Sequence, residues 1–189
     1  KNVYQVLGKD ILRFHAIYWP IMLMALDIPL NFKLYVHGWI LNRDGKMSKS
    51  RGNSVYPMDL VNRYGIDSVR YYLAKELPLG NDGLFGYERF AERYNTELAN
   101  DLGNWLSRTV AMVEKYFGGV IPNADVATLY DQDLVSTINE NLKATLENFE
   151  AFNLQDAIEC TWKIIRRANK YIDETAPWAL AKDESKVGE

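Results

Sequence analysis

The chain has 189 residues, of which 48% are hydrophobic and 25% are charged, so its composition is that of a globular protein and does not indicate disorder. Its single cysteine, Cys160, excludes an intrachain disulfide and suits a reducing cytoplasm. The net charge of the whole chain, −3, argues against nucleic-acid binding, because proteins that bind nucleic acid usually carry a basic surplus. The charge is uneven, however: residues 1–56 carry +5 (eight Lys/Arg, three Asp/Glu), and residues 57–189 carry −8 (fourteen Lys/Arg, twenty-two Asp/Glu). A basic first segment suits phosphate, and an acidic second segment can bind RNA only through a local cationic patch.

Both ends of the sequence look cut. The chain starts at Lys1 without an initiator Met, no signal-peptide pattern follows, and residues 186–189 form no closing element. The longest apolar run, Ala16 to Leu26, has 11 residues and contains Pro20, whereas a helix that spans a bilayer needs about 20. We therefore expect a piece of a longer protein, with a buried core helix in this run.

Residues 1–53 have the pattern of an α/β segment. Apolar residues at steps of three and four predict a helix over residues 9–27, and the short apolar stretch 33–41 predicts one buried strand. A polar, glycine-flanked loop follows at residues 42–53. Helix, strand and loop in this order fit the end of a nucleotide-binding sheet, whose ligands lie at the carboxyl ends of the strands.

The rest of the chain is predicted to be helical, so the fold class is mainly α. Pro57 opens a short helix that ends at Gly65, and Asp67 caps the next one. Residues 79–86 form a loop and a domain boundary. Apolar stripes then predict helices over residues 87–117, 134–149 and from 154 onward after the cap Asn153, and Pro177 opens a fourth. Amphipathic helices with short links make an up-down bundle.

The loop between Gly45 and Gly52 carries the strongest chemical signal, the sequence Lys46-Met47-Ser48-Lys49-Ser50. Two lysines three residues apart can close over a polyphosphate, and the serines can donate to phosphate oxygens. Because charge develops on those oxygens during attack at phosphorus, positioned cations lower the barrier. The alternative is an ordinary solvated basic loop.

This pentapeptide, KMSKS, is the signature loop of class I aminoacyl-tRNA synthetases. By itself the motif leaves the methionine, isoleucine, valine, leucine and cysteine enzymes open. The flanking segments resemble methionyl-tRNA synthetases in particular, and the resemblance covers essentially the whole chain. It rests on Gly8-Lys9-Asp10-Ile11, Phe14-His15, Trp19-Pro20, His37-Gly38, Asn95, Leu98-Ala99-Asn100, Leu102-Gly103-Asn104, Arg108 and Ala176-Pro177-Trp178. Tyr56, before Pro57, departs from the acidic residue that the family often has there, which puts the cap of the following helix in doubt.

The resemblance implies roles for residues 8–50. Lys49 would contact the ATP phosphates and stabilise the transition state, while Lys46, Met47, Ser48 and Ser50 complete the loop. The ribose would meet Gly8 and Asp10, whose carboxylate can accept from hydroxyl groups, and His37 and Ile40 would line the nucleotide side. Aromatic walls suit a thioether through sulfur–ring contacts, and the implied methionine pocket consists of Phe14, His15 and Trp19.

Each of these residues also has an ordinary structural interpretation. Asp10 could cap the helix that follows, which the sequence by itself favours. A histidine on a partly apolar helix, such as His15, is more often a hydrogen-bonded core residue, and Phe14 and Trp19 are more often plain core. Cys160 has no recognisable partner and is expected to be structural.

The helix after Asn153 carries four cations on one face, opposite its apolar face. Lys163, Arg166, Arg167 and Lys170 stand at i, i+3, i+4 and i+7, and no acidic residue interrupts the run. This stripe is our candidate for the cationic patch that RNA requires. The alternative is a solvated helix face.

For the anticodon the resemblance implies Asn104, Arg108, Pro177 and Trp178. An amide and a guanidinium can hydrogen-bond to base edges, and a tryptophan held at a helix start by proline can stack on a base. Without the resemblance, Trp178 would be assigned to the core.

The resemblance implies a division into three parts: residues 1–53, the C-terminal part of a Rossmann-type catalytic domain; 54–86, a connecting segment that contacts the tRNA stem; and 87–189, a helical-bundle anticodon-binding domain. The implied reaction is ATP-dependent activation of methionine, with Mg²⁺ accompanying ATP, and transfer to tRNA(Met). The family's HIGH-type motif and its inserted, sometimes zinc-binding domain lie outside the chain, which is expected to be inactive alone and to hold no metal itself. A non-catalytic tRNA-binding module is the rival, although such a module would not need Lys49.

Overall fold

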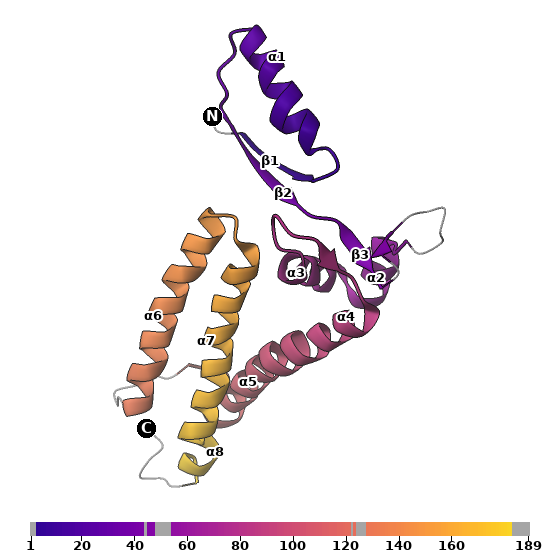
Figure 1. The fold of residues 1–189 in the computed structure, drawn as a ribbon. Coiled ribbons are helices and arrows are strands. Elements are labelled where there is room, and N and C mark those ends of the chain that lie inside the picture. The colour runs from indigo at the N-terminus through magenta and orange to yellow at the C-terminus, as the bar shows by residue number, and fades with distance from the viewer. Residues whose placement is uncertain (1–2, 44, 48–53, 122, 124–127, 183–189) are drawn as a thin grey trace. The chain divides into compact units, whose positions relative to one another are not determined.

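The computed structural model describes residues 3–43, 45–47, 54–121, 123 and 128–182, which are mainly helical with two small sheets. They divide into two units, residues 1–90 with 151–155 and residues 91–150 with 156–189. Figure 1 shows the order of the elements.

The first unit begins with a strand, a helical segment and a second strand, and the two strands lie side by side. Strand β1 (Val3–Gly8) pairs in parallel with β2 (Phe32–His37), from Val3 opposite Phe32 to Gly8 opposite His37. The connection contains a π-helix, η1 (Phe14–Tyr18), which continues into α1 (Trp19–Ala25). Parallel pairing requires such a crossover, and it places the carboxyl ends of both strands at one edge.

The single strand expected at residues 33–41 is wrong. Strand β2 ends at His37, and a separate strand, β3 (Ile40–Asn42), follows Gly38 and Trp39. A Cβ atom on Gly38 would lie 2.1 Å from the carbonyl oxygen of Asn81, so the chain bends where another loop approaches its backbone closely. The helix expected over residues 9–27 is shorter, because the helical stretch that includes η1 and α1 covers residues 12–25.

Part of the expected loop 42–53 is a strand instead. The short strand β4 (Gly45–Lys46) pairs with β3 in antiparallel fashion, and β5 (Gly83–Leu84) pairs with β3 in parallel. The loop expected at 79–86 therefore also contains a strand. Both corrections involve two-residue strands, which are too short to leave a periodic signal in the sequence.

Two helices pack beside this second sheet. Helix α2 (Pro57–Tyr64) begins at its proline and ends before Gly65, as expected, and Tyr56 provides no side-chain cap. Helix α3 (Ile66–Glu76) begins one residue before Asp67, which lies in its first turn and is not the N-cap; that expectation is wrong. An aromatic core of Tyr72, Phe85 and Phe90, with ring centroids 5.1 and 5.7 Å from Tyr72, stabilises the unit.

The long helix expected over residues 87–117 is confirmed, in three consecutive parts: α4 (Tyr87–Arg93), the π-helical η3 (Tyr94–Gly103) and α5 (Asn104–Phe117). The boundary between the two units falls within α4. Gly118 ends α5 with a left-handed backbone, φ 60°.

The second unit is completed by α6 (Leu129–Glu150), α7 (Leu154–Thr175) and the short α8 (Pro177–Leu180), which confirm the three remaining expected helices. Helices α6 and α7 lie side by side (Figure 1), joined by an ion pair between Asp133 and Arg167. The core lies mainly on α7, where the expected apolar face is buried: Trp162, Ile165 and Ile172, together with Ala157 and the free Cys160. Among the described residues, no helix is both long and apolar enough to cross a membrane.

Candidate functional site

The carboxyl ends of β1 and β2 bring together three of the residues expected at a nucleotide. Gly8 lies opposite His37 in the parallel register, and the Lys9 amide donates to the His37 carbonyl at 3.0 Å. A Cβ on Gly8 would lie 2.5 Å from Oδ1 of Asp10 and 3.3 Å from Cε1 of His37. The absence of a side chain at Gly8 therefore leaves a space between a carboxylate and an imidazole, at the strand edge where α/β sheets bind ligands.

Asp10 does not cap a helix within the described part of the chain. The helical turn starts at Leu12 and continues into η1, which has no side-chain hydrogen bond at its cap position. The Asp10 carboxylate is exposed at the strand edge. His37 uses Nδ1 for a 2.9 Å hydrogen bond with the Gly38 carbonyl, which fixes the ring and leaves Nε2 for a ligand.

The loop that contains Asp82 contacts this strand edge, and the sequence did not indicate this contact. The Asp82 carboxylate forms an ion pair with Lys9 and accepts the amide proton of Trp39 at 2.8 Å. The Lys9 ammonium also lies 5.8 Å from the Trp39 ring centroid. The hydrogen bond from Lys9, and next that from the Trp39 amide, hold the pKa of Asp82 below its ordinary value. Asp82 thus ties the end of β1 to the turn after β2.

The signature loop is described only at its start. Gly45 and Lys46 form β4, whose backbone pairs with Asn42 and Leu41, and Met47 is half-buried. Ile40 lies in β3, opposite Gly83 of β5. The expected phosphate-contacting residues Ser48, Lys49 and Ser50 lie outside the described residues.

The candidate methionine-pocket residues follow one another along a single helical segment. Phe14 and His15 belong to η1, and Trp19 is the first residue of α1. Phe14 is 58% exposed and Trp19 40% exposed, so neither ring is core in the described structure. His15 shares a 3.0 Å hydrogen bond with the Ile11 carbonyl through Nδ1. π-helical turns are rare and often mark functional sites, and this one contains two of the three candidates.

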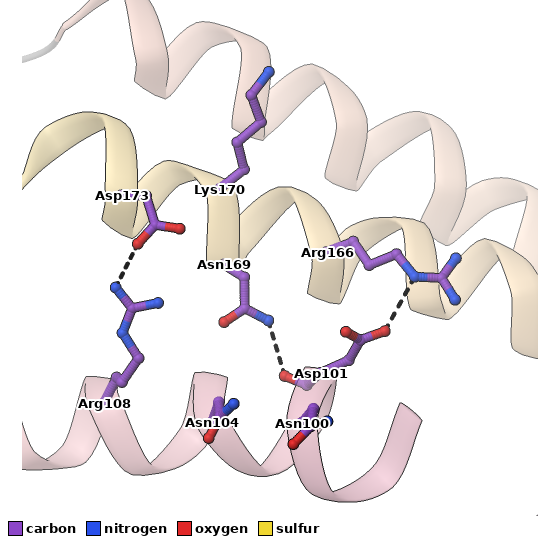
Figure 2. A pocket seen from close by; sticks show the side chains of 8 residues that line it. All are labelled: Asn100, Asp101, Asn104, Arg108, Arg166, Asn169, Lys170 and Asp173. Carbon is purple, nitrogen blue, oxygen red and sulfur yellow. Dashed lines mark hydrogen bonds and ion pairs between the residues drawn. The ribbon is translucent and has the colours of Figure 1, made fainter. Parts of the chain in front are cut away.

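In the second unit, two expected anticodon residues line an open groove of about 410 Å³. One wall is the helix formed by η3 and α5, and the other is α7 (Figure 2). Its lining residues are Asn100, Asp101, Asn104, Arg108, Arg166, Asn169, Lys170 and Asp173. Every lining side chain is polar or charged, which suits base edges and phosphate better than an apolar ligand.

Arg108 connects this groove to Trp178. Its Nη2 donates to Asp173 at 2.6 Å, and its Cζ lies 5.7 Å from the centroid of the Trp178 ring. Trp178 is 42% exposed and therefore not a core residue. Pro177 stands at the start of α8, after Ala176, whose φ of 43° is unusual for a residue with a side chain. The strained turn presents the indole beside a guanidinium.

Two of the four cations in the expected stripe on α7 are paired with acidic residues. Arg167 is largely buried, its side chain 10% exposed, and pairs with Asp133 and Glu174. Arg166 pairs with Glu97, Asp101 and Glu159. These acidic residues lie on other helices or on other turns of α7. The sequence of residues 163–170 by itself therefore does not show that Arg166 and Arg167 are paired.

The remaining two cations are more accessible. Lys170 is 69% exposed and lies 3.3 Å from Glu174, a pair that solvent screens strongly. Lys163 is exposed and has no side-chain partner within the described residues. Burial opposes the charge of Arg166, but its hydrogen bonds to Asp101 and Glu159 outweigh this, and its pKa lies above the ordinary value.

Comparison with known proteins identifies similar chains. Residues 1–110 match the family described as tRNA synthetases class I (M). Methionine–tRNA ligase 1 of Bacillus cereus is 56% identical over 182 residues, which are 95% of this chain and 27% of that protein. Methionine–tRNA ligase of Halalkalibacterium halodurans is 56% identical over 182 residues, 96% of this chain and 28% of that protein.

Solved structures give the same result. The Mycobacterium tuberculosis methionyl-tRNA synthetase bound by methionyl-adenylate superposes with a TM-score of 0.92 at 41% identity, over 98% of this chain and 36% of that one. The apo form of that enzyme gives a TM-score of 0.87 at 37% identity, with the same coverage. The chain thus spans little more than a quarter of the length of the curated relatives it matches, 27% and 28%.

Proposed function

The chain belongs to the methionyl-tRNA synthetases, a family of class I tRNA synthetases, and from this premise we propose that it forms part of an enzyme that activates methionine with ATP and transfers it to tRNA(Met). The observation that carries the proposal is the meeting of Gly8, Asp10 and His37 at the carboxyl edge of two parallel strands, in a chain that also contains the KMSKS loop. Alone, the chain is inactive, because the residues that complete the reaction lie elsewhere in the family's longer enzymes.

In the proposed first step, a methionine carboxylate oxygen attacks the α-phosphorus of ATP. A new oxygen–phosphorus bond forms while the bond to pyrophosphate breaks, and the electron pair leaves with pyrophosphate. Asp10 accepts hydrogen bonds from the ribose hydroxyls, Gly8 allows the sugar to approach the backbone, and His37 and Ile40 line the nucleotide. Magnesium, which arrives with ATP, neutralises charge on the phosphate oxygens.

The signature loop supplies cations at the departing phosphates. Lys49 stabilises the charge that grows on the phosphate oxygens, and Lys46, Met47, Ser48 and Ser50 hold the loop over them. Its start is anchored, since β4 pairs with β3.

Methionine would bind along the helical segment that follows β1. Phe14 and Trp19 offer aromatic faces to the thioether, and His15, already hydrogen-bonded to the Ile11 carbonyl, borders the same segment. Both rings are exposed in the described structure, so each is available to a ligand.

We assign residues 1–53 to the C-terminal part of a Rossmann-type catalytic domain, 54–86 to a connecting segment against the tRNA stem, and 87–189 to a helical-bundle anticodon-binding domain. The parallel pair β1–β2 with its helical crossover supports the first assignment, and helices α5 to α8 support the last. In the bundle, Asn104 and Arg108 read base edges while Trp178, held by Pro177, stacks on a base. We place the enzyme in the cytoplasm, which the single cysteine suits.

Pyrophosphate exchange tests the proposal. The complete synthetase carrying these residues should exchange pyrophosphate into ATP only when methionine is present, and the 189-residue chain should bind tRNA(Met) without exchange activity. Exchange driven by isoleucine, valine, leucine or cysteine would assign the enzyme to another class I synthetase. tRNA binding without exchange by the complete protein would favour a non-catalytic tRNA-binding module.

A further inference from the structure

Arg166 has all three of its guanidinium nitrogens directed at carboxylates. Nε lies 3.1 Å from Oδ2 of Asp101, Nη1 lies 3.0 Å from Oε1 of Glu159, and Nη2 lies 3.4 Å from Oε1 of Glu97. A guanidinium presents its donors in a fixed, planar fork, so one that holds three carboxylates has little left to offer a phosphate. Its position on a cationic helix face therefore does not make it a phosphate contact.

Of these three carboxylates, that of Glu97 most needs a compensating cation, because it is buried. Only 1% of this residue is exposed, and Arg93 also pairs with its carboxylate at 2.9 Å. A buried carboxylate is costly unless cations and hydrogen bonds compensate for its lost hydration. Arg166 thus neutralises a charge that the helix η3 carries into the interior of the second unit.

A second contact holds the same helix through its backbone. The Asn169 side-chain amide, one turn along α7 from Arg166, donates to the Asp101 carbonyl at 2.8 Å (Figure 2). Asp101 is therefore fixed twice from α7, by its carboxylate and by its carbonyl. Glu97 and Asp101 both lie within η3, which spans ten residues.

The geometry of η3 explains why it needs such contacts. π-helical turns are rare and usually single, because their hydrogen bonds run to the fifth residue and replace the favoured spacing of the α-helix. The segment leads directly into α5, whose first residue is Asn104. A change from π to α spacing in η3 would rotate Asn104 and Arg108 relative to α7 and hence relative to the groove.

We propose that Arg166 is a positioning residue for anticodon recognition: it fixes η3 through Glu97 and Asp101, and so orients Asn104 and Arg108, without contacting RNA. This inference rests on the proposed anticodon function of the groove. It gives Arg166 a different role from Lys163, which is on the same helix, is exposed and has no acidic partner among the described residues.

The test compares Arg166→Met with the matched control Lys163→Met, both in the complete synthetase that contains these residues. The dissociation constant is measured for the anticodon stem-loop of tRNA(Met) and for the same stem-loop with a changed anticodon, over a series of salt concentrations. Arg166→Met should weaken cognate binding about tenfold or more and reduce the preference between the two RNAs, with the salt slope unchanged. Lys163→Met should instead flatten the salt slope by up to about one unit and leave the preference intact.

Two further variants separate positioning from general instability. Arg166→Met leaves the buried Glu97 with one cation fewer, so Glu97→Gln is added to remove the charge; the double variant should recover its melting temperature but not its anticodon preference. In a chain that already carries Asn104→Ala and Arg108→Ala, Arg166→Met should cause no further loss of binding. Amide hydrogen exchange at residues 94–103 should be faster in Arg166→Met than in Lys163→Met.

Two results overturn the inference. Unchanged preference with a flatter salt slope in Arg166→Met would make Arg166 a phosphate contact, and unchanged binding altogether would give it no role in recognition. In either case the native chain still discriminates between the anticodons, and the proposed function stands. A native chain that does not discriminate between the two RNAs overturns the proposed anticodon function, and the positioning role with it.

Discussion

Arg108 donates a 2.6 Å hydrogen bond to the carboxylate of Asp173 across the groove between α5 and α7. The same guanidinium lies 5.7 Å from the Trp178 ring, so the carboxylate holds the cation beside the indole before any RNA is present. Asp173 is mostly exposed, its side chain 63% accessible, and the pair is therefore well screened by water. In the proposed anticodon site, a base would compete with Asp173 for Arg108 at modest cost.

Replacement of Arg108 by lysine should weaken tRNA binding although the charge is kept. A lysine ammonium cannot present the planar, paired donors that a base edge requires. We expect a loss of about 1–3 kcal/mol, or about tenfold to a hundredfold in affinity, in filter binding with tRNA(Met). Methionine-dependent pyrophosphate exchange by the complete synthetase serves as the control and should not change. Equal affinity of the two proteins would remove Arg108 from the anticodon site.

Lys49→Ala in the complete synthetase should lower kcat for adenylate formation by about a hundredfold to a thousandfold, the usual scale for the loss of one transition-state donor. The lysine acts on charge that appears only during reaction, so the Kd for methionine should barely move. Single-turnover measurement of adenylate formation separates the two quantities. Normal pyrophosphate exchange in this variant would show that Lys49 has no catalytic role.

Asp82→Asn should raise the KM for ATP several-fold in the complete synthetase. The amide keeps a hydrogen bond to the Trp39 amide but loses the ion pair with Lys9, which ties the Gly8 edge to the turn after β2. The KM for methionine should change less. Asp27→Asn is a suitable control, because Asp27 is exposed and its left-handed backbone, φ 53°, accommodates asparagine. Equal KM values for ATP in Asp82→Asn and Asp27→Asn would contradict a role for Asp82 at the nucleotide site.

Stability should fall between about pH 10 and 12 through Tyr171. Burial, and next the hydrogen bond to Asp131, raise the pKa of Tyr171 from 10.0 to about 12. Below pH 10 the phenol is protonated in both the folded and the unfolded chain, and its stabilising contribution is complete. Above pH 10 the unfolded chain loses this proton first, so ionisation favours unfolding until the folded pKa is reached. Urea unfolding at pH 9 and pH 11.5 should show a smaller loss for Tyr171→Phe than for the native chain.

The sequence predicted those features whose signals are local. Helices α2, α5, α6 and α7 have apolar periodicity over two or more turns, and Pro57, Gly118 and Pro177 mark their ends, so these elements are where the pattern places them. The break at Gly38 was not predictable, because its cause is the backbone of Asn81, more than 40 residues away. The same distance effect hid the acids around Arg166: Glu97 and Asp101 precede it by 69 and 65 residues.

Some residues of the candidate site were indicated by the sequence and others were not, for the same reason. The resemblance named Gly8, His37, Arg108 and Trp178, and the structure places Gly8 opposite His37 and Arg108 beside Trp178. Asp82 and Asp173 were missed, because an isolated aspartate in a loop or on a helix face carries no pattern of its own. Each gains its role only from a cation brought to it by the fold: Lys9 for Asp82 and Arg108 for Asp173.

Trp178→Ala should separate tRNA charging from amino-acid activation. Stacking on an aromatic ring contributes about 1–3 kcal/mol per base, so aminoacylation of tRNA(Met) should fall about tenfold to a hundredfold. Methionine activation without tRNA should stay near the native rate, because the adenylate residues lie in the other unit. The exposed indole, 42% accessible, predicts a small change in melting temperature as well. If both activities fell together with a lowered melting temperature, Trp178 would be a structural residue, and its guanidinium neighbour Arg108 would have to read the anticodon without a stacking partner.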